Sequence, residues 1–528
     1  MFSIGQSDGK QGVGVNLGSY VTRASTFWPD QQALVCGERR WSYRELEERT
    51  NRLASALLAS GVEPGQAVAT FSGNSAELVE TEIACYKGGF LRVPISARLS
   101  AGEVEHILAD ADVRVLLVDA EHAEAAQKAA IGTSCALIDY DGRTPDARSY
   151  ADVLAAGSPE PVAVEVSADD PSVLHFTSGS TGKLKAAVQT NGNRLANMRK
   201  RLMSPEGAPS AAERYLAAGP ITHATGMGLL AAFSRGATAV VLPRFGAVEF
   251  LEAVEKERVT STFLVPVMLN MVLSHPGLGD FDLSSLRCLR VGGAPVSPQR
   301  LRDAVAAFGP VVMQGYGQGE TTSGVTVLTC ADVVRGIDED PELLSSAGRP
   351  LFDSEVRVVD DEGRAVPAGE LGEVVVRGPD CVTEYWHEPD LSAETFRDGW
   401  VYTGDIGYLR ADGYLFIVDR KKDMIISGGY NIFCTEVESV LYEHPAVSEA
   451  CVVGVPDEKW GEAVKAVVVR RSAATAEELI EFCAERLARI KKPRSVDFAD
   501  ELPVNRNGKI DRRAVRDRYW AGEARKVH

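Results

Sequence analysis

The chain has 528 residues, of which 45% are hydrophobic and 25% charged, a composition typical of a globular protein rather than a disordered or fibrous one. A chain of this length is too long for a single hydrophobic core, so we expect at least two domains. The formal net charge of −18 at pH 7 argues against binding to nucleic acid or to an anionic membrane surface, because both are themselves negatively charged.

The cysteine pattern and the apolar runs indicate where the protein works. Nine cysteines are scattered without a CxxC pair or a Cys/His cluster at zinc-binding spacing, so we expect free thiols in a reducing compartment. No apolar run reaches about 18 residues, and the first thirty residues do not read as a secretion signal. These features predict a cytoplasmic protein without a membrane span, and a homodimer is compatible with them.

Residues 40–380 alternate helix-like and strand-like segments, as layers of helices packed on sheets do. Two helix starts have capping-box spacing, at Ser42 with Glu45 and at Ser100 with Glu103. Short apolar runs separated by helix-length segments predict strands of a parallel sheet. These runs are VRVLLVD (113–119), TAVVLP (238–243), STFLV (261–265) and LRCLRV (286–291).

From about residue 355 the pattern changes to closely spaced strands with Asp/Gly turns, which predicts a small antiparallel region. A compact α+β segment follows Asp419. The sequence therefore predicts an α/β fold. A large N-terminal domain (1–419) would hold layered α/β sheets and the small antiparallel region, and a small α+β C-terminal domain (420–528) would follow.

The segment TSGSTGKLK (177–185) follows a strand-like run and is rich in hydroxyl and backbone N–H donors, which suit phosphate oxygens. It is not a Walker A loop, because Leu184 follows Lys183 where that motif needs Ser or Thr, and Thr177 stands in place of its first glycine. By itself, the segment is more readily explained as a solvated turn.

Four further motifs follow in a fixed order: QGYGQGETT (314–322), YTGDIG (402–407), DRKKDMIISGGYNI (419–432) and PVNRNGK (503–509). With TSGSTGKLK, they resemble the adenylate-forming superfamily of acyl-CoA synthetases, luciferases and peptide-synthetase adenylation domains over nearly the whole chain. The resemblance implies that a carboxylate attacks the α-phosphate of ATP to give acyl-AMP and pyrophosphate. A thiol or another nucleophile then displaces AMP.

The resemblance assigns the phosphate and metal contacts. Lys185 would be the characteristic lysine of the loop, and Glu320 would hold Mg²⁺ through its hard carboxylate oxygens. The β- and γ-phosphates would be wrapped by Thr177, Ser178, Gly179, Ser180, Thr181 and Gly182.

It also assigns the nucleoside contacts. Tyr316, followed by Gly317 and Thr321 in the same motif, would stack on adenine. Asp405 would accept hydrogen bonds from the ribose hydroxyls, with Arg420 assisting. Taken without their neighbours, Tyr316 reads as a packed aromatic residue and Asp405 as a turn residue.

The C-terminal domain is expected to move. Lys509 matches the lysine that contacts the carboxylate and the α-phosphate during adenylation. Lys422 matches the hinge about which this domain swings between the adenylation and thioester-forming poses. In the second pose Gly428 and Gly429 would face the pantetheine tunnel of coenzyme A, where glycine allows close backbone approach. A charged linker and a simple turn are the competing interpretations.

The acyl pocket is expected around His223, whose position in the family lines the pocket and gates the tunnel, although a single histidine is often structural. Small residues at Gly292, Gly293 and Gly315 would line the rest. These segments offer no obvious cation for a second carboxylate, which favours a monocarboxylic acid, aliphatic or aromatic.

Leu184 and Ala186 stand where the family has Pro before and Gly after Lys185, which reshapes the loop exit without removing a donor. Two further positions depart from the family pattern. Gly319 stands where a threonine hydroxyl usually touches the α-phosphate, and Thr321 or Thr322 is a candidate replacement for that contact, as is a backbone N–H. Cys434 replaces a usual proline, and we expect it to pack in the core because nothing beside it favours a thiolate.

The leading hypothesis is an acyl- or aryl-CoA synthetase that uses ATP, Mg²⁺ and coenzyme A on a small-molecule carboxylic acid, because PDEKWGEAVKAVVV (456–469) resembles free-standing CoA ligases. One alternative keeps adenylation but transfers the acyl group to a carrier-protein thiol, an amine or another nucleophile. Another alternative is a protein that binds nucleotide without turnover.

Overall fold

The computed structural model describes residues 15–178, 184–322, 324–504 and 510–520. The chain forms two compact units, Met1–Val356 with Val376–Val401, and Arg357–Val375 with Tyr402–His528. The chain passes between them within three strands, β17 (Glu355–Val359), β18 (Gly372–Arg377) and β20 (Trp400–Leu409). The domain boundary expected between residues 419 and 420 stays a prediction.

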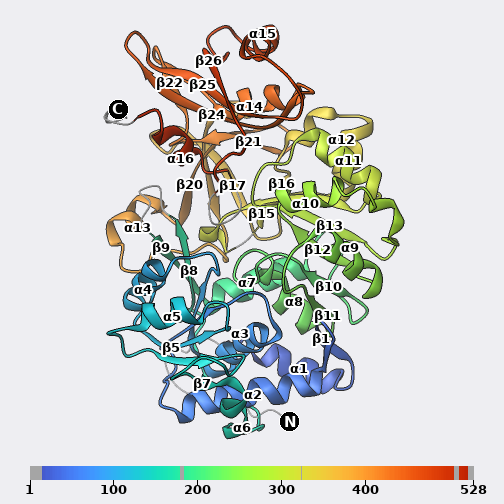
Figure 1. Ribbon diagram of the computed structural model, residues 1–528, viewed down its shortest axis with the longest axis vertical. Coiled ribbons are helices and arrows are strands. Elements are labelled where there is room, and N and C mark those ends of the chain that lie inside the picture. Colours follow the sequence, from blue (N-terminus) through green and yellow to red (C-terminus); the bar gives the residue numbers. More distant parts are fainter. Residues whose placement is uncertain (1–14, 179–183, 323, 505–509, 521–528) are drawn as a thin grey trace. The chain divides into compact units, whose positions relative to one another are not determined.

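The first unit contains a seven-stranded sheet with the order β7-β6-β5-β3-β4-β8-β9 (Figure 1). Its neighbouring strands are parallel except for the hairpin of β8 and β9. The strands are β3 (Ala67–Phe71), β4 (Leu91–Ile95), β5 (Val113–Val118), β6 (Ala136–Asp139), β7 (Arg148–Ser149), β8 (Pro171–Ser178) and β9 (Leu184–Thr190).

A nine-stranded sheet in the same unit has the order β16-β15-β14-β13-β12-β10-β11-β1-β2. Its central strands, from β14 to β1, are parallel, and β15, β16 and β2 join the two edges antiparallel. The strands are β1 (Gln32–Cys36), β2 (Arg39–Ser42), β10 (Arg214–Ala217), β11 (Thr238–Val241), β12 (Ser261–Leu264), β13 (Cys288–Gly292), β14 (Val312–Gly317), β15 (Gly324–Leu328) and β16 (Arg349–Pro350).

The helices of the first unit follow the strands in the alternation that the sequence predicts. They are α1 (Ser19–Phe27), α2 (Tyr43–Ala59), α3 (Ala76–Gly88), α4 (Ala101–Asp110), α5 (Ala123–Ala130), α6 (Tyr150–Ala156), α7 (Asn191–Leu202), α8 (Leu229–Ser234), α9 (Ala247–Lys256), α10 (Pro266–Leu273), α11 (Pro298–Phe308), α12 (Cys330–Asp338) and α13 (Pro389–Thr395), with 3-10 turns η1 (Gly226–Gly228), η2 (Leu278–Asp280), η3 (Gly319–Thr321) and η4 (Pro341–Ser345).

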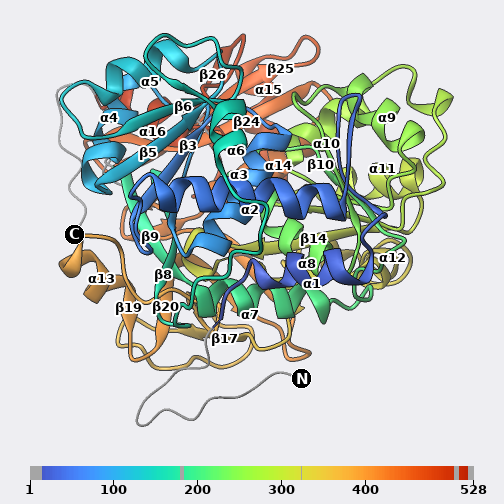
Figure 2. The same ribbon diagram turned by 90° about the horizontal axis from the view of Figure 1, so that it is seen from below.

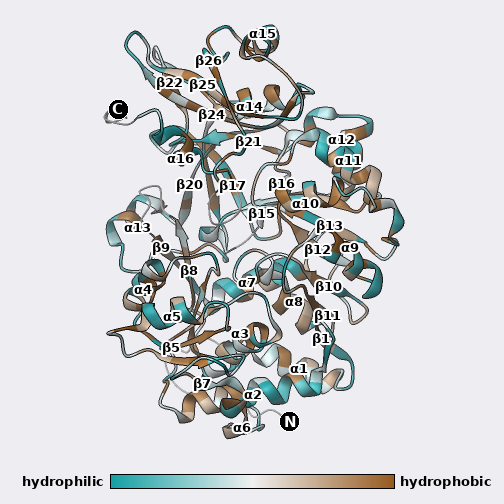
Figure 3. Cartoon of the chain, in the orientation of Figure 1, coloured by the Kyte–Doolittle hydropathy of each residue, from teal (hydrophilic) through white to brown (hydrophobic). Residues whose placement is uncertain are grey.

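The sequence predictions for the layered region are confirmed. Both predicted helix starts have the capping box, with the Ser42 and Ser100 N–H groups donating to Glu45 and Glu103 at 2.7 and 2.9 Å. The four apolar runs form β5, β11, β12 and β13. Figure 3 shows hydrophobic colour on inner strands such as β12 and β13. This α/β layering is the expected fold class.

Helix α3 lies between the two sheets, and all of its residues are buried. Leu78 and Ile83 pack with β1, β10 and β11 of the larger sheet, whereas Ala84 and Cys85 pack with β3 and β5 of the smaller one. Figure 2 shows α3 close to the long helix α2. The charged residues of α3 are neutralised by ion pairs: Glu77 with Arg39, Glu80 with Arg49, Glu82 with Arg92 and Arg194, and Lys87 with Glu47.

The second unit contains the predicted antiparallel region and the predicted α+β segment. In the first, β17, β18 and β20 are neighbours in that order, and β21 (Leu415–Arg420) also pairs with β20. The short strand β19 (Phe396–Arg397) pairs with Trp400 and Val401 of β20, all within the first unit. In the second, strands β22 to β26 form one sheet covered by α14 and α15. Its elements are β22 (Ile425–Ser427), β23 (Tyr430–Ile432), α14 (Cys434–Glu443), β24 (Val447–Asp457), β25 (Gly461–Arg470), α15 (Ala476–Arg486), β26 (Ser495–Ala499) and α16 (Arg512–Asp517).

Among the residues described, no helix combines the length and the apolar character that crossing a bilayer requires.

Candidate active site

The β8–β9 hairpin holds the two ends of the predicted phosphate loop. Thr177 and Lys185 are cross-strand neighbours, as are Ser178 and Leu184. A strand therefore follows the loop, whereas a Walker A loop leads into a helix. The predicted contacts Gly179, Ser180, Thr181 and Gly182 lie outside the described residues.

Three side chains meet beside this hairpin. The Lys185 Nζ lies 3.5 Å from Glu320 Oε1 and 3.8 Å from the centre of the Tyr385 ring. The Tyr385 hydroxyl donates to the same Glu320 oxygen at 2.7 Å. Both charged side chains are largely buried, with exposed fractions of 19% for Lys185 and 12% for Glu320. A cation, a carboxylate and a phenol are thus held together in a partly dehydrated place, where charge interactions are stronger than in water.

Backbone pairing fixes this cluster. The Val382 N–H donates to the Glu320 carbonyl oxygen at 2.9 Å, and Tyr385 forms a β-bridge with Ala187 of β9. The segment that carries Tyr385 is thereby tied both to η3 and to β9. Burial and then the negative charge of Glu320 raise the pKa of Tyr385, so the phenol stays protonated and remains a donor.

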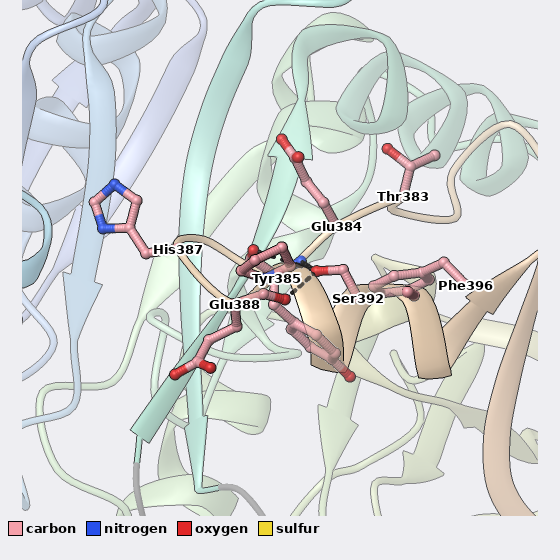
Figure 4. Close-up of a pocket in the computed structure, with 9 residues that line it drawn as sticks. Thr383, Glu384, Tyr385, His387, Glu388, Ser392 and Phe396 are labelled. Atoms are coloured by element: carbon pink, nitrogen blue, oxygen red, sulfur yellow. Dashed lines mark hydrogen bonds between the residues drawn. The ribbon is translucent and has the colours of Figure 1, made fainter.

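A pocket of about 430 Å³ adjoins this segment (Figure 4). The Tyr385 ring packs against Phe396 at 5.1 Å between ring centroids, and Ser392 bonds to the backbone of Tyr385. His387 points away from them. Tyr385 is the one lining residue that also belongs to the Lys185 cluster, so the pocket lies beside that cluster rather than enclosing it.

Two threonine hydroxyls next to the cluster have no hydrogen-bond partner. Within the described part of the chain, the Oγ1 atoms of Thr177 and Thr322 are buried and unpaired. The hydroxyl of Thr321, in contrast, donates to the Gln318 carbonyl oxygen at 3.1 Å. Thr322 has a φ of 54°, a backbone conformation that costs a non-glycine residue roughly 1–3 kcal/mol and often marks functional sites. Unpaired buried hydroxyls suit a ligand that brings its own polar oxygens, as a phosphate does.

The donor set also fits Mg²⁺. Among the described residues there is no group of three or more His, Cys, Asp or Glu side chains that could hold a metal ion. Mg²⁺ is commonly held by one or two carboxylates together with substrate phosphates and water. Glu320 alone therefore suffices if the nucleotide supplies the remaining oxygens.

Neighbouring glycines let β13 and β14 approach each other closely at their ends. Gly292 and Gly315 are paired across these strands. A Cβ on Gly292 would lie 2.7 Å from the Gly315 carbonyl oxygen and 3.3 Å from the Phe263 ring, so a larger residue does not fit there. Gly293 follows with a φ of 83°, which favours glycine. The predicted pocket residues Gly292 and Gly315 are thus neighbours across two strands, and Gly293 comes directly after β13.

The other two predicted contacts in this unit have local partners. Tyr316 lies on β14, and its hydroxyl is 3.5 Å from Gln318 Nε2. His223 lies in the turn before η1, where its Nδ1 is 2.8 Å from the Thr222 hydroxyl. Its ring meets that of His175 edge-on, at 5.7 Å between centroids.

The second unit brings the predicted ribose contacts together. Asp405 and Arg420 are cross-strand neighbours on β20 and β21, with Arg420 Nε 2.6 Å from Asp405 Oδ1. Asp405 is 2% exposed, whereas Arg420 is exposed. The predicted hinge residue Lys422 lies in the exposed turn after β21. Lys509 lies outside the described residues.

Gly428 and Gly429 form the two-residue turn between β22 and β23, with φ angles of 58° and 82°. Such turns need positive φ at both positions, which glycine adopts freely. A Cβ on Gly428 would lie 2.4 Å from the Trp460 ring, whereas a Cβ on Gly429 would meet nothing within 4 Å. The backbone of Gly429 is therefore open to a close approach.

Sequence reasoning missed Tyr385, His175 and Trp460. Tyr385 lies 65 residues beyond Glu320 in an unremarkable segment, and no spacing rule links the two. His175 could have been noticed, because it stands two residues before Thr177 on the same strand and therefore on the same face.

Comparisons with known proteins identify the family of the chain. A family model described as AMP-binding enzyme matches residues 21–386, and the model for the AMP-binding enzyme C-terminal domain matches residues 436–509. A feruloyl-CoA synthase from an Amycolatopsis species is 41% identical over 95% of this chain and 99% of its own. The medium/long-chain-fatty-acid–CoA ligase FadD8 of Mycobacterium tuberculosis is 37% identical over 94% of this chain and 89% of its own.

Among solved structures, the amide bond synthetase McbA from Marinactinospora thermotolerans has a TM-score of 0.86 and 31% identity, covering 95% of this chain and 99% of its own. The family models span both units, and the relatives match nearly end to end. The chain belongs to the AMP-binding enzyme family of adenylate-forming ligases.

Proposed function

We propose that this AMP-forming acid–thiol ligase activates an aromatic monocarboxylic acid and transfers it to coenzyme A. The acid carboxylate attacks the α-phosphate of ATP, the bond to the β-phosphate breaks, and pyrophosphate leaves. The thiol of coenzyme A then attacks the carbonyl carbon of the acyl-adenylate and AMP leaves. The aromatic assignment rests on the 41% identity to a feruloyl-CoA synthase.

The observation that carries the ligase chemistry is the meeting of Lys185, Tyr385 and Glu320 beside unpaired threonine hydroxyls. Bound Mg²⁺ would neutralise charge on the phosphates, and Glu320 would hold it with Tyr385 fixing the carboxylate. Lys185 would pair with phosphate oxygens, and Thr177 and Thr322 would donate their free hydroxyls to them. Such prearranged donors stabilise the negative charge that develops in the transition state as the α-phosphate is attacked.

The remaining predicted residues complete the proposal. Asp405, with Arg420, would bind the ribose hydroxyls, and Tyr316 would stack on adenine. Lys509 would contact the carboxylate and the α-phosphate during the first step. The open backbone at Gly429 would admit the pantetheine arm in the second. A cytoplasmic location fits because ATP and coenzyme A are both available there.

An amine acceptor is the second candidate, favoured by the likeness to an amide bond synthetase at 31% identity. Adenylation is common to both candidates, so the first half-reaction does not separate them. The two candidates differ in the nucleophile that takes the acyl group from the acyl-adenylate.

A substrate panel tests both parts. Pyrophosphate release is measured with substituted cinnamic acids, benzoic acids and fatty acids, each with coenzyme A, with an amine or with neither. We expect the greatest kcat/KM with a cinnamic acid and acyl-CoA as the product. Greatest kcat/KM with a fatty acid would refute the aromatic assignment, amide formation in preference to thioester would refute the acceptor, and release independent of any acid would refute the ligase assignment.

A further inference from the structure

The side chain of His175 occupies the space above Gly319. A Cβ on Gly319 would lie 2.9 Å from Cδ2 and 3.6 Å from Nε2 of the His175 ring, and 3.5 Å from the Thr177 methyl group. At a contact below 3.0 Å an atom must move, so the His175 ring would have to shift for a threonine to fit at position 319. The histidine ring therefore occupies space that a side chain at position 319 would need.

The ring lies among residues that the proposed reaction uses. His175 is on the same face of β8 as Thr177, whose hydroxyl is unpaired. On another side its ring meets the edge of the His223 ring. Gly319, beneath it, directly precedes the proposed metal ligand Glu320. The imidazole thus lies between the phosphate side and the acyl side of the site.

Within the described residues, the hydrogen-bonding capacity of the imidazole is unused. No described residue donates to or accepts from its ring nitrogens. Burial, and then His223, lower the pKa of His175 to about 3, so the ring is neutral at physiological pH. A neutral imidazole has one N–H donor and one acceptor, and a half-buried ring with neither satisfied is suited to a ligand.

We propose that His175 binds the acyl-adenylate, donating from its ring the hydrogen bond that a threonine hydroxyl at position 319 gives to the α-phosphate in the usual family pattern. The proposal rests on the adenylation reaction proposed above. It explains why the chain keeps glycine at position 319 and assigns a role to a histidine that the family motifs do not include.

Three variants test it: His175→Ala, Gly319→Thr and the double variant His175→Ala/Gly319→Thr. Loss of one donor to a developing charge should lower kcat of acid-dependent pyrophosphate release roughly 10- to 100-fold in His175→Ala, with the KM for the acid little changed. Gly319→Thr should lose activity by crowding the ring. The double variant should recover most of kcat, because the hydroxyl returns and the ring that blocks it is gone.

Non-additivity is the decisive result. Activity of the double variant equal to the product of the two single losses, or wild-type kcat in His175→Ala, would overturn the proposal. Melting temperatures of all variants separate effects on folding from effects on chemistry. If His175→Ala folds poorly, His175→Gln is the second test: it keeps an N–H donor and should retain more kcat than His175→Ala. Wild-type activity distinguishes the two proposals, because acid-dependent release in the wild type supports adenylation whatever the variants do.

Discussion

At the scale of single residues, the site depends on side chains that hold other side chains. Tyr385 does not carry charge, yet it contacts both charged members of the cluster, with its ring under Lys185 and its hydroxyl on Glu320. Loss of a group that orients a metal ligand typically lowers metal affinity roughly 10- to 100-fold, because an unrestrained carboxylate samples unproductive orientations. Tyr385 is in this sense a positioning residue.

Tyr385→Phe removes the hydroxyl and keeps the ring. We expect the Mg²⁺ concentration for half-maximal pyrophosphate release to rise roughly 10-fold, because Glu320 is no longer held. Tyr140→Phe is the matched control, since it removes a hydroxyl that bonds to Thr81 at 2.9 Å elsewhere in the same unit. An equal rise in both variants would show that the effect is a general loss of stability rather than a loosened carboxylate.

The lowered pKa of His175 predicts how folding stability depends on pH. Its pKa is lowered to about 3, below the ordinary value of 6.5, by burial and by the charges of His223, Arg92 and Arg194. The unfolded chain therefore binds a proton that the folded chain refuses, so folding stability is full above pH 6.5 and falls as pH drops toward 3. The slope contributed by this residue approaches about 1.4 kcal/mol per pH unit.

Thermal unfolding between pH 7.5 and 4.5 measures this contribution. His175→Gln lacks the titrating group, so its melting temperature should fall less steeply with acidification than that of the wild type. Parallel curves for the two proteins would show that the ring is protonated without cost in the folded state.

At the scale of elements, the strands were predictable and the buried charges were not. Runs such as those of β5 and β12 are apolar because both faces of a parallel sheet are covered, and this leaves a clear pattern. Helix α3 carries Glu77, Glu80, Glu82 and Lys87, residue types that are mostly exposed in proteins, yet every one is buried. Their partners come from distant segments, and a single sequence holds no record of that pairing.

Glu80→Ala tests how much α3 depends on these pairs. Glu80 is fully buried and bonds to Arg49 at 2.5 Å and to the Tyr150 hydroxyl at 2.7 Å. Its removal leaves the partly buried Arg49 guanidinium and the Tyr150 hydroxyl without this partner, and we expect a loss of about 3 kcal/mol in unfolding free energy. Glu124→Ala in α5 breaks the exposed pair with Lys128 and should cost less than about 1 kcal/mol. Similar losses measured by urea unfolding would contradict the role of burial.

At the scale of the whole molecule, the motifs predict the chemistry, whereas the domain boundary between residues 419 and 420 stays a prediction. The order of motifs led to the adenylate-forming superfamily, and both family models agree with it. The chain crosses between the two compact units within β17, β18 and β20. Because each crossing lies inside a strand, the sequence at these points does not have the composition of a linker. The two half-reactions nevertheless draw on different residues, so they are separable by substitution.

Gly429→Leu should separate them. The φ of 82° makes any side chain strained, but a Cβ there meets no atom within 4 Å, so the folded unit accommodates it while the backbone becomes closed to the pantetheine arm. We expect conversion of supplied acyl-adenylate to thioester to fall at least about 10-fold, with acid-dependent pyrophosphate release in the absence of coenzyme A largely kept.

Gly369→Leu provides the matched control, because Gly369 lies in the same unit with a φ of 87° and equally open surroundings. It carries the same backbone strain without the proposed contact, so both of its half-reactions should stay near wild type. Stopped-flow measurement of each half-reaction distinguishes the cases. If both variants lose thioester formation to the same extent, strain in the second unit is the cause, and the approach of coenzyme A lies elsewhere.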